Sequence, residues 1–355
     1  MKSYVTSAFE SLVSFGYGVL NSKKALSNGY IPINISELEM PILIIAPHPD
    51  DEWLSSAGLI SEASKIDLSS VIDVLVMSKG EAYTRIDKKW SKHNKTQLSE
   101  ERRMETILSL AYLTKNTINP MFLEFKDGKI ADPFIHNDTE NILFNFNVMR
   151  NSIMKKDYGT YIFPIIFDDN SDHWGSALYT ILATYSLSLG KHLKTANSTF
   201  LMYLTHFYNY PIRGTSNKLR NVFPPFAESG LFSELILSNE SYKDKRSALK
   251  FFKSQNIDFG NSIMLRDFIK HNEPFVKLNL KANPKLSNIT YLGKQDSDVE
   301  YKYYNFIFSN EGVLEYIDTD NIYSFNHNHV SITLAKGRKH INVSELKIET
   351  SIYET

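Results

Sequence analysis

The stretch that decides the fold is Ile42-Leu-Ile-Ile-Ala-Pro-His-Pro-Asp-Asp-Glu52. It opens with an apolar run, 42–46, and a short apolar run bounded by turn residues is typical of a buried strand. His48, Asp50 and Asp51 follow at once. Open α/β sheets bind their ligands just beyond the carboxyl ends of their strands. An imidazole and two carboxylates therefore lie where such folds place their ligand-binding and catalytic residues.

Outward from this stretch, strands and helices are predicted to alternate up to residue 207. The expected strands are 42–46, 71–77, 121–125, 161–167 and 200–207, and the expected helices are 53–64, 99–114, 138–157 and 174–189. This alternation predicts an α/β fold with a Rossmann-like, mostly parallel sheet and helices on both faces. The turn after the first strand lacks a Gly-x-Gly-x-x-Gly phosphate loop, so dinucleotide binding is not expected.

Three parts are predicted along the chain. Residues 1–40 are expected to form an N-terminal helical extension, because the charge and serines within this stretch suit an amphipathic helix better than a signal peptide. Residues 41–275 are expected to form the main domain, with further helices at 241–255 and 263–271. Residues 276–355 are expected to form a small antiparallel β-rich domain; its strands are predicted at 275–280, 301–308, 330–334 and 341–352.

The composition of the 355 residues, 42% hydrophobic and 22% charged, is that of a soluble globular protein. A formal net charge of −1 argues against a general binder of nucleic acid or membrane surfaces, which needs a positive field. The absence of cysteine excludes disulfides and thiolate metal sites, so His, Asp or Glu must hold any transition metal. No run of about 18 apolar residues occurs. A cytoplasmic location is the default expectation.

A second polar cluster, Asp168-Asp-Asn-Ser-Asp-His173, follows the fourth expected strand. The carboxyl ends of two parallel strands can bring His48, Asp51 and His173 together. Two histidines and one carboxylate are a recognised catalytic zinc set, which Fe²⁺ also accepts, whereas Mg²⁺ and Ca²⁺ prefer oxygen ligands alone. The remaining carboxylate, Asp50, is then a candidate general base. The alternative is a polar turn in which Asp51 caps the next helix.

Residues 42–52 resemble the opening motif of the LmbE-like, or PIG-L, family of zinc-dependent N-acyl-sugar deacetylases. The resemblance extends over residues 41–255. Its further motifs, in family order, are Lys79-Gly-Glu81, Arg102-x-x-Glu105, Asp127-Gly128, Asp172-His173, Lys245-Arg-x-Ala-Leu249 and Ser254-Gln255. The first motif is highly specific, and the others gain weight from their order.

The resemblance implies a hydrolase that removes an N-acetyl group from an amino sugar, such as N-acetylglucosamine, or from a sugar conjugate by means of zinc-activated water. The implied zinc ligands are His48, Asp51 and His173, and the implied general base is Asp50. Arg102 is implied as a substrate contact, and Asp127 as a support that orients a neighbouring charged group. The expected partner is a small N-acetylated sugar or glycoconjugate.

One departure from the family pattern concerns the proton donor to the leaving amine. The family's second motif usually carries another histidine three residues before the ligand histidine, and here that place is Asn170. An amide can hydrogen-bond an oxyanion but cannot supply a proton at neutral pH. Either Asp50 performs both proton transfers or another residue compensates. The candidate is His206, at the end of the fifth expected strand, with a structural histidine as the equal alternative.

Two further functions stay open at this stage. Asn170 and the β-rich C-terminal region also fit a catalytically impaired, metal-bearing carbohydrate-binding protein. An amidase acting on a thiol-sugar conjugate would use the same machinery, because substrate choice lies in loops 82–97, 126–137 and 208–235. His327 and His329 are a weaker metal candidate, since no third ligand accompanies them. The exact substrate, the native metal and the oligomeric state are not specified.

Overall fold

The structure, a computed structural model, describes residues 31–82, 95–115, 120–166, 168–190, 198–207, 210–211, 220–222, 232–255 and 259–278, and the backbone of four strands between 288 and 324. The helices are α2 (Asp51–Lys65), α3 (Lys95–Thr114), α4 (Asp132–Ile135), α5 (Thr139–Ile153), α6 (Ser171–Leu189), α7 (Asn239–Ala248) and α8 (Phe259–Asp267), with 3-10 turns η1 (Ile35–Glu37), η2 (Ser69–Val71) and η5 (Leu249–Phe251). The strands are β1 (Ile31–Pro32), β2 (Ile42–Ala46), β3 (Ile72–Ser78), β4 (Met121–Phe125), β5 (Thr160–Pro164), β6 (Thr199–Tyr203), β7 (Phe232–Ile236), β8 (Asn272–Leu278), β9 (Asn288–Lys294), β10 (Glu300–Phe308), β11 (Leu314–Asp318) and β12 (Ile322–Ser324).

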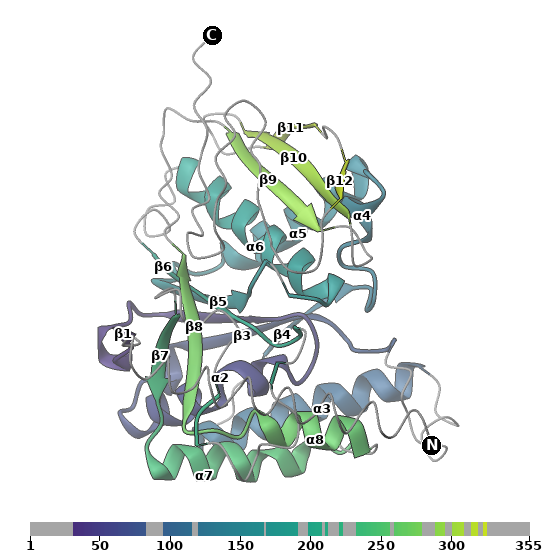
Figure 1. Cartoon of the computed structure of the whole chain (residues 1–355). Helices are drawn as coiled ribbons and strands as arrows, with labels where there is room; N and C mark the ends of the chain where they lie inside the picture. The colour runs from purple at the N-terminus through teal and green to yellow at the C-terminus, as the bar shows by residue number, and fades with distance from the viewer. Residues whose placement is uncertain are drawn as a thin grey trace.

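The main sheet has eight strands in the order β1-β7-β8-β6-β5-β2-β3-β4. Neighbouring strands are parallel except at β8, which is antiparallel to both β6 and β7. Helices α4, α5 and α6 lie over one face of the sheet, and α2, α3 and α7 lie over the other (Figure 1). The predicted α/β architecture, with a mostly parallel sheet covered on both faces, is therefore confirmed.

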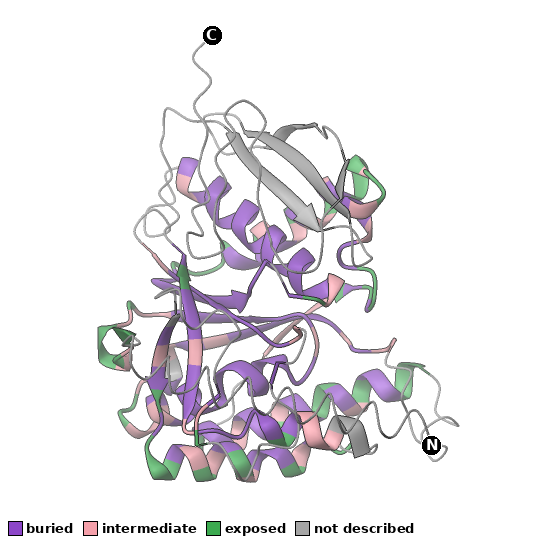
Figure 2. Cartoon of the chain, viewed as in Figure 1, coloured by how far each residue is buried: buried purple, intermediate pink, exposed green. Residues whose placement is uncertain are grey.

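The centre of the sheet is buried on both faces. All five residues of β2 are buried, as are all those of β5, and Figure 2 shows the middle of the sheet almost entirely in the buried colour. A parallel strand with helices on both sides needs apolar residues at consecutive positions rather than at alternate ones. The continuous run Ile42–Ala46 meets this requirement, which is why it identifies the central strand.

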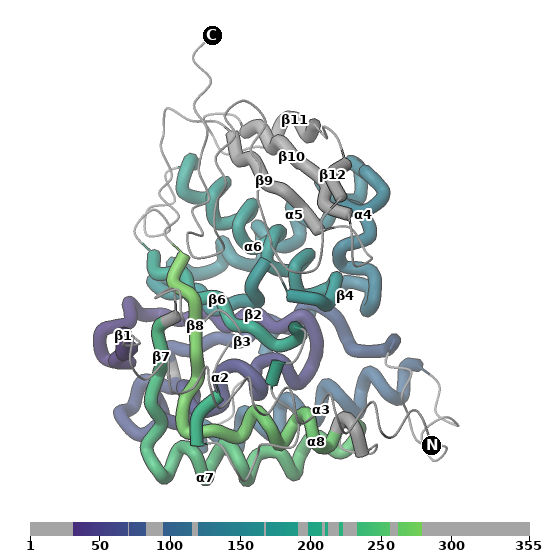
Figure 3. The backbone as a smooth tube through the Cα atoms, viewed as in Figure 1, coloured from purple at the N-terminus to yellow at the C-terminus, as the bar shows by residue number. Residues whose placement is uncertain are grey.

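The strand order reverses between β2 and β5. From β2 the chain passes through α2 to β3 on one side, and from β5 it passes through α6 to β6 on the other (Figure 3). Right-handed crossovers that run in opposite directions place their helices on opposite faces, and a crevice opens where they part. The polar segments after β2 and β5 both lie at this reversal point.

Several predicted boundaries shift. The helix expected from Trp174 begins at Ser171, because the Asn170 side chain caps it by accepting a hydrogen bond from the Asp172 N–H at 2.9 Å. His173 therefore lies inside the first turn of α6 and not before the helix. The helix expected at 138–157 is α5, which ends at Ile153, and the short helix α4 before it was not expected. The helix expected at 241–255 is α7 followed by η5.

The C-terminal expectations are met in part. Strands β9 to β12 form a separate four-stranded antiparallel sheet, in which only β10 coincides with an expected strand, that at 301–308. The strand expected at 275–280 in that unit is instead β8, which pairs with β6 and β7 in the main sheet. An isolated strand pattern does not reveal which sheet completes its hydrogen bonds, and this is why the assignment was wrong. The pattern also missed β7.

Some expectations concern residues outside the described part of the chain. These are the helix within residues 1–30, the strands at 330–334 and 341–352, and His327 and His329. Residues 31–40 are described, and they contain β1 and η1 rather than an α-helix. In the described residues, no helix combines the length and the apolar character needed to cross a bilayer.

A buried ion pair ties α2 to the distant elements α7 and β8. The Lys245 ammonium lies 2.7 Å from Glu273 and also donates to the Leu54 carbonyl at 3.0 Å. The two Glu273 oxygens accept the backbone N–H groups of Gly58 and Leu59, each at 2.8 Å. The carboxylate and the ammonium thus bind backbone groups in the middle of the helix that carries Asp51.

Replacing Glu273 by Ala is expected to destabilise the protein by about 3–5 kcal/mol, because it leaves a buried ammonium and two N–H groups without their partner. Urea unfolding would measure the change. The exposed pair Lys79–Glu124, also at 2.7 Å, is the matched control. Glu124→Ala is expected to cost about 0.2–1 kcal/mol. Equal losses in the two variants would contradict the role of burial.

Candidate metal centre and active site

The turn after β2 is built to present side chains rather than to cap a helix. Asp50 occupies the N-cap position of α2 with a φ of 122°, and its side chain makes no capping hydrogen bond. Its backbone N–H donates to Glu52 at 3.0 Å, and the Asp51 carboxylate accepts the His48 N–H at 3.0 Å. The alternative in which Asp51 caps the helix is wrong, because Asp51 is the first residue of α2 and its carboxylate turns back to the His48 N–H. A strained aspartate that does not cap its helix points to a functional constraint.

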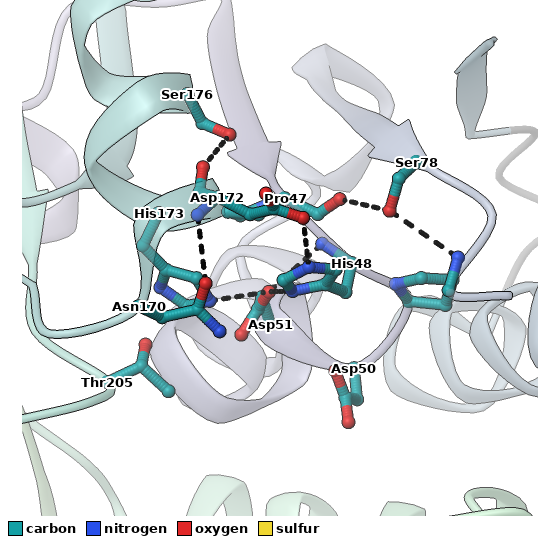
Figure 4. Close-up of polar contacts among 12 residues, drawn as sticks. Pro47, His48, Asp50, Asp51, Ser78, Asn170, Asp172, His173, Ser176 and Thr205 are labelled. Carbon is teal, nitrogen blue, oxygen red and sulfur yellow. Dashed lines mark hydrogen bonds and ion pairs between the residues drawn. The ribbon is translucent and has the colours of Figure 1, made fainter. Parts of the chain in front are cut away.

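His48, Asp51 and His173 converge at the crevice, as predicted. Asp51 Oδ2 lies 3.1 Å from His48 Nδ1 and 3.2 Å from His173 Nε2. One candidate ligand atom from each of the three residues falls within 4.8 Å of the others. Figure 4 shows the three side chains gathered together, with Asp50 lower in the view and its carboxylate pointing away from them. Ligands at 2.0–2.1 Å from a tetrahedral metal lie about 3.3 Å apart, so these spacings suit such a site.

The surroundings of the His173 ring also suit a metal site. The ring is fully buried, and neither of its nitrogens has a partner with hydrogen-bond geometry, although each lies within about 3.3 Å of a carboxylate oxygen. Buried polar atoms without partners are rare and need an explanation. A metal between His173 Nε2 and Asp51 Oδ2 would supply one. The donor set fits Zn²⁺ and Fe²⁺ alike.

Two more carboxylates face the other side of the His48 ring. His48 Nε2 lies 3.1 Å from Asp172 Oδ2 and 3.2 Å from Asp127 Oδ1. Asp172 also accepts the N–H groups of Gly128 at 2.6 Å and Ile130 at 2.9 Å, which fastens the loop after β4 to the start of α6. The expected supporting role of Asp127 fits this position. Asp172 was missed as a site residue, although its place beside His173 was a signal.

The electrostatics of the cluster favour a bound cation. Burial raises the pKa of Asp50 to about 7, against the opposing charge of Arg102. Burial alone would lower the pKa of His48, but hydrogen bonds to carboxylates, that to Asp127 foremost, raise it well above its usual range. Burial likewise opposes ionisation of Asp51, but the neighbouring histidines hold its pKa well below the usual range. Carboxylates thus dominate the described part of the site.

Arg102 is buried and bound to protein groups. Its guanidinium donates to the carbonyls of Gly80 and Pro49, both at 2.8 Å, and lies 3.5 Å from Asp50 Oδ1. When the oxygen and nitrogen of the Gln255 side-chain amide are exchanged, the amide oxygen accepts a further hydrogen bond from Arg102 Nε at 2.7 Å. Arg102 borders the cavity, but these contacts make it a support for Asp50 as well as a possible substrate contact.

Gly80→Ala is expected to disturb this support. Gly80 has a φ of +70°, and a Cβ there would overlap the Arg102 guanidinium. The matched control is Gly128→Ala, because Gly128 has a similar φ of +75° but its nearest neighbour, Ala82, would be 3.6 Å away. Each change should cost about 1–2 kcal/mol for the left-handed backbone, and Gly80→Ala should cost more. Urea unfolding of both variants checks this, and equal losses would contradict it.

A cavity of about 300 Å³ adjoins the cluster. Its lining includes the predicted residues Asp50, Asn170 and His206 together with Leu54 and Met264. A larger cavity of about 700 Å³ lies along α3, and none of the predicted site residues lines it. The convergence of ligand groups, and not cavity size, therefore selects the candidate site.

Asn170 and His206 both reach the cavity. Asn170 Oδ1 is already used in capping α6, so its NH₂ group is the part suited to meet a substrate oxygen. The His206 ring stands edge-on to His173 with 4.7 Å between ring centroids. Burial, with the nearby His173, lowers the pKa of His206, which favours a neutral ring. Sequence reasoning missed two other buried carboxyl groups at the site, those of Glu52 and Asp168.

Comparison with known proteins agrees with this geometry. The family model described as PIG-L, GlcNAc-PI de-N-acetylase, matches residues 43–180. No protein of curated function matches the chain.

Among solved structures, the conserved protein TT1542 of Thermus thermophilus is 19% identical, with a TM-score of 0.45 and coverage of 69% of this chain and 96% of that one. The N,N′-diacetylchitobiose deacetylase of Pyrococcus horikoshii is 15% identical, with a TM-score of 0.45 and coverage of 67% and 84%. The zinc-inhibited form of the teicoplanin deacetylase Orf2 is 18% identical, with a TM-score of 0.43 and coverage of 67% and 98%.

The family match begins inside β2 and ends inside α6, so it spans both polar segments that contribute the candidate metal ligands. The order of the motifs, the reversal point of the sheet and the matched family model agree. Residues 43–180 of this chain are a domain of the PIG-L (LmbE-like) family.

Proposed function

We propose that the protein is a metal-dependent deacetylase that hydrolyses the N-acetyl group of an amino sugar or sugar conjugate. The observation that carries the proposal is the convergence of His48, Asp51 and His173 next to a cavity that His48, Asp51 and Asp50 line. The family match over both polar segments supports it. The proposed metal is Zn²⁺, with Fe²⁺ as the alternative.

The proposed ligands are His48, Asp51 and His173. When bound there, zinc would supply an activated water and polarise the acetyl carbonyl. Asp50 takes a proton from the attacking water, because its pKa near 7 suits a base that works at neutral pH. Arg102 holds that carboxylate in place.

The remaining steps concern the oxyanion and the leaving amine. The NH₂ group of Asn170 and the ring of His206 border the cavity, and both can donate hydrogen bonds to a developing oxyanion. Asn170 cannot protonate the amine. We therefore assign the second proton transfer to Asp50, which returns the proton it took. His206 is the alternative donor, but its lowered pKa favours a neutral ring, so it would first have to take up a proton.

The test combines metal content with turnover. The purified protein should contain close to one zinc or iron per chain by elemental analysis, and it should release acetate from N-acetylglucosamine or N,N′-diacetylchitobiose. Removal of the metal by a chelator should abolish release, and added zinc should restore it. A fully metallated protein that releases nothing from a broad panel of N-acetylated sugars would count against the proposal.

A second candidate is a metal-bearing protein that binds carbohydrate without turnover. The observation that favours it is Asn170, which stands in place of a histidine and caps a helix. Asp50 argues against it, because a pure binding site needs no base. Tight sugar binding by the metallated chain with no acetate release would favour this candidate. Cleavage of a thiol-sugar conjugate alone would favour the amidase.

A further inference from the structure

The carboxylate of Asp168 joins the ends of two strands. It is completely buried in the loop that follows β5. Its Oδ1 accepts the Asn170 N–H at 2.9 Å, and its Oδ2 accepts the N–H groups of Thr205 at 3.1 Å and His206 at 2.9 Å. One side chain thus organises the start of α6 and the segment after β6, which together form one wall of the site.

The same oxygen faces the candidate ligand histidine. Asp168 Oδ2 lies 3.3 Å from His173 Nδ1, while the other ring nitrogen, Nε2, lies 3.2 Å from Asp51 Oδ2. The His173 side chain is as fully buried as that of Asp168. Because water does not screen charges at this buried position, the negative charge of Asp168 interacts strongly with the His173 ring.

We propose that Asp168 is a positioning residue that keeps the proton of neutral His173 on Nδ1 and so presents the Nε2 lone pair to a metal at Asp51. A neutral imidazole carries one N–H, and a carboxylate beside one nitrogen favours the proton there. The other tautomer would set a lone pair against the Asp168 oxygen and an N–H toward the metal position. This inference rests on the proposed function and adds a residue to it.

The arrangement also couples two residues of the site. The Asp168 oxygen that faces His173 holds the backbone of His206, whose ring stands against the His173 ring. Loss of the carboxylate should therefore loosen the ligand and the neighbouring histidine together. A carboxylate behind a ligand histidine typically changes metal affinity 10- to 100-fold when it is removed.

The first test compares Asp168→Asn with Asp169→Asn. The amide keeps the shape of the side chain but loses its charge and one acceptor oxygen. Asp169 is next in sequence and exposed, so its variant is the matched control. Zinc affinity, measured by competition with a chromophoric chelator, should fall about 10- to 100-fold in Asp168→Asn and stay unchanged in Asp169→Asn. Equal zinc affinity in wild type and Asp168→Asn, even with a lower melting temperature, would overturn the inference.

The second test needs no variant. Long-range ¹H–¹⁵N spectra of the zinc-loaded protein with ¹⁵N-labelled histidine should show His173 protonated at Nδ1 and metallated at Nε2. Zinc on Nδ1 would overturn the role of Asp168 while leaving a metal-dependent deacetylase intact. A wild-type protein that binds no zinc through His173 would overturn both proposals. A metallated protein with the expected His173 spectrum but no turnover would overturn the proposed function alone.

Discussion

Asp50→Asn is expected to lower the rate of acetate release by about 10²- to 10⁴-fold while the protein keeps its metal, because the amide cannot accept the proton from water. Asn also tolerates the positive φ of this position, so the turn should keep its shape. Acetate release and zinc content should be measured on the same preparation. The signature is a large loss of turnover without a loss of metal.

The matched control is Asp67→Asn. Asp67 lies just beyond the other end of α2, is exposed and also has a positive φ, of 58°. This variant should keep the wild-type rate. If Asp50→Asn kept more than a tenth of the wild-type rate, Asp50 would not be the base. If it lost its zinc, the carboxylate would belong to the ligand set instead.

His173→Ala is expected to remove metal binding. The variant loses one of three proposed ligands, so its zinc affinity should fall by more than the roughly 100-fold that a supporting carboxylate can account for. A ligand that binds only the folded state stabilises it by about 2.7 kcal/mol at a free concentration 100 times its dissociation constant. Zinc should therefore raise the melting temperature of the wild type but not that of His173→Ala.

The control for this variant is His136→Ala, because His136 is exposed just past α4 and away from the crevice. Its zinc content, thermal shift and acetate release should match those of the wild type. A zinc-dependent thermal shift of normal size in His173→Ala would show that the metal binds elsewhere. The second group of potential ligands, His48 with Asp127 and Asp172, would then be the next to test.

Local sequence determined the central elements. The apolar run of β2 and the helical spacing after it depend on neighbouring residues, so they can be predicted without knowing what packs around them. The same holds for the position of His48, Asp50 and Asp51 at a strand end. The meeting of these residues with His173 also followed from sequence, because parallel strands share one carboxyl edge.

The tertiary structure alone decided what each buried polar group contacts. Asp168 faces His173, and Arg102 donates hydrogen bonds to the carbonyls of Gly80 and Pro49. Both contacts depend on which segments pack together. The insertion of β8 between β6 and β7 is of the same kind. Hydrophobic periodicity indicates which face of an element is buried. The partner of a buried charged group depends instead on which segments the tertiary fold places next to it. Sequence thus located the candidate site residues, and the fold decided which groups support them.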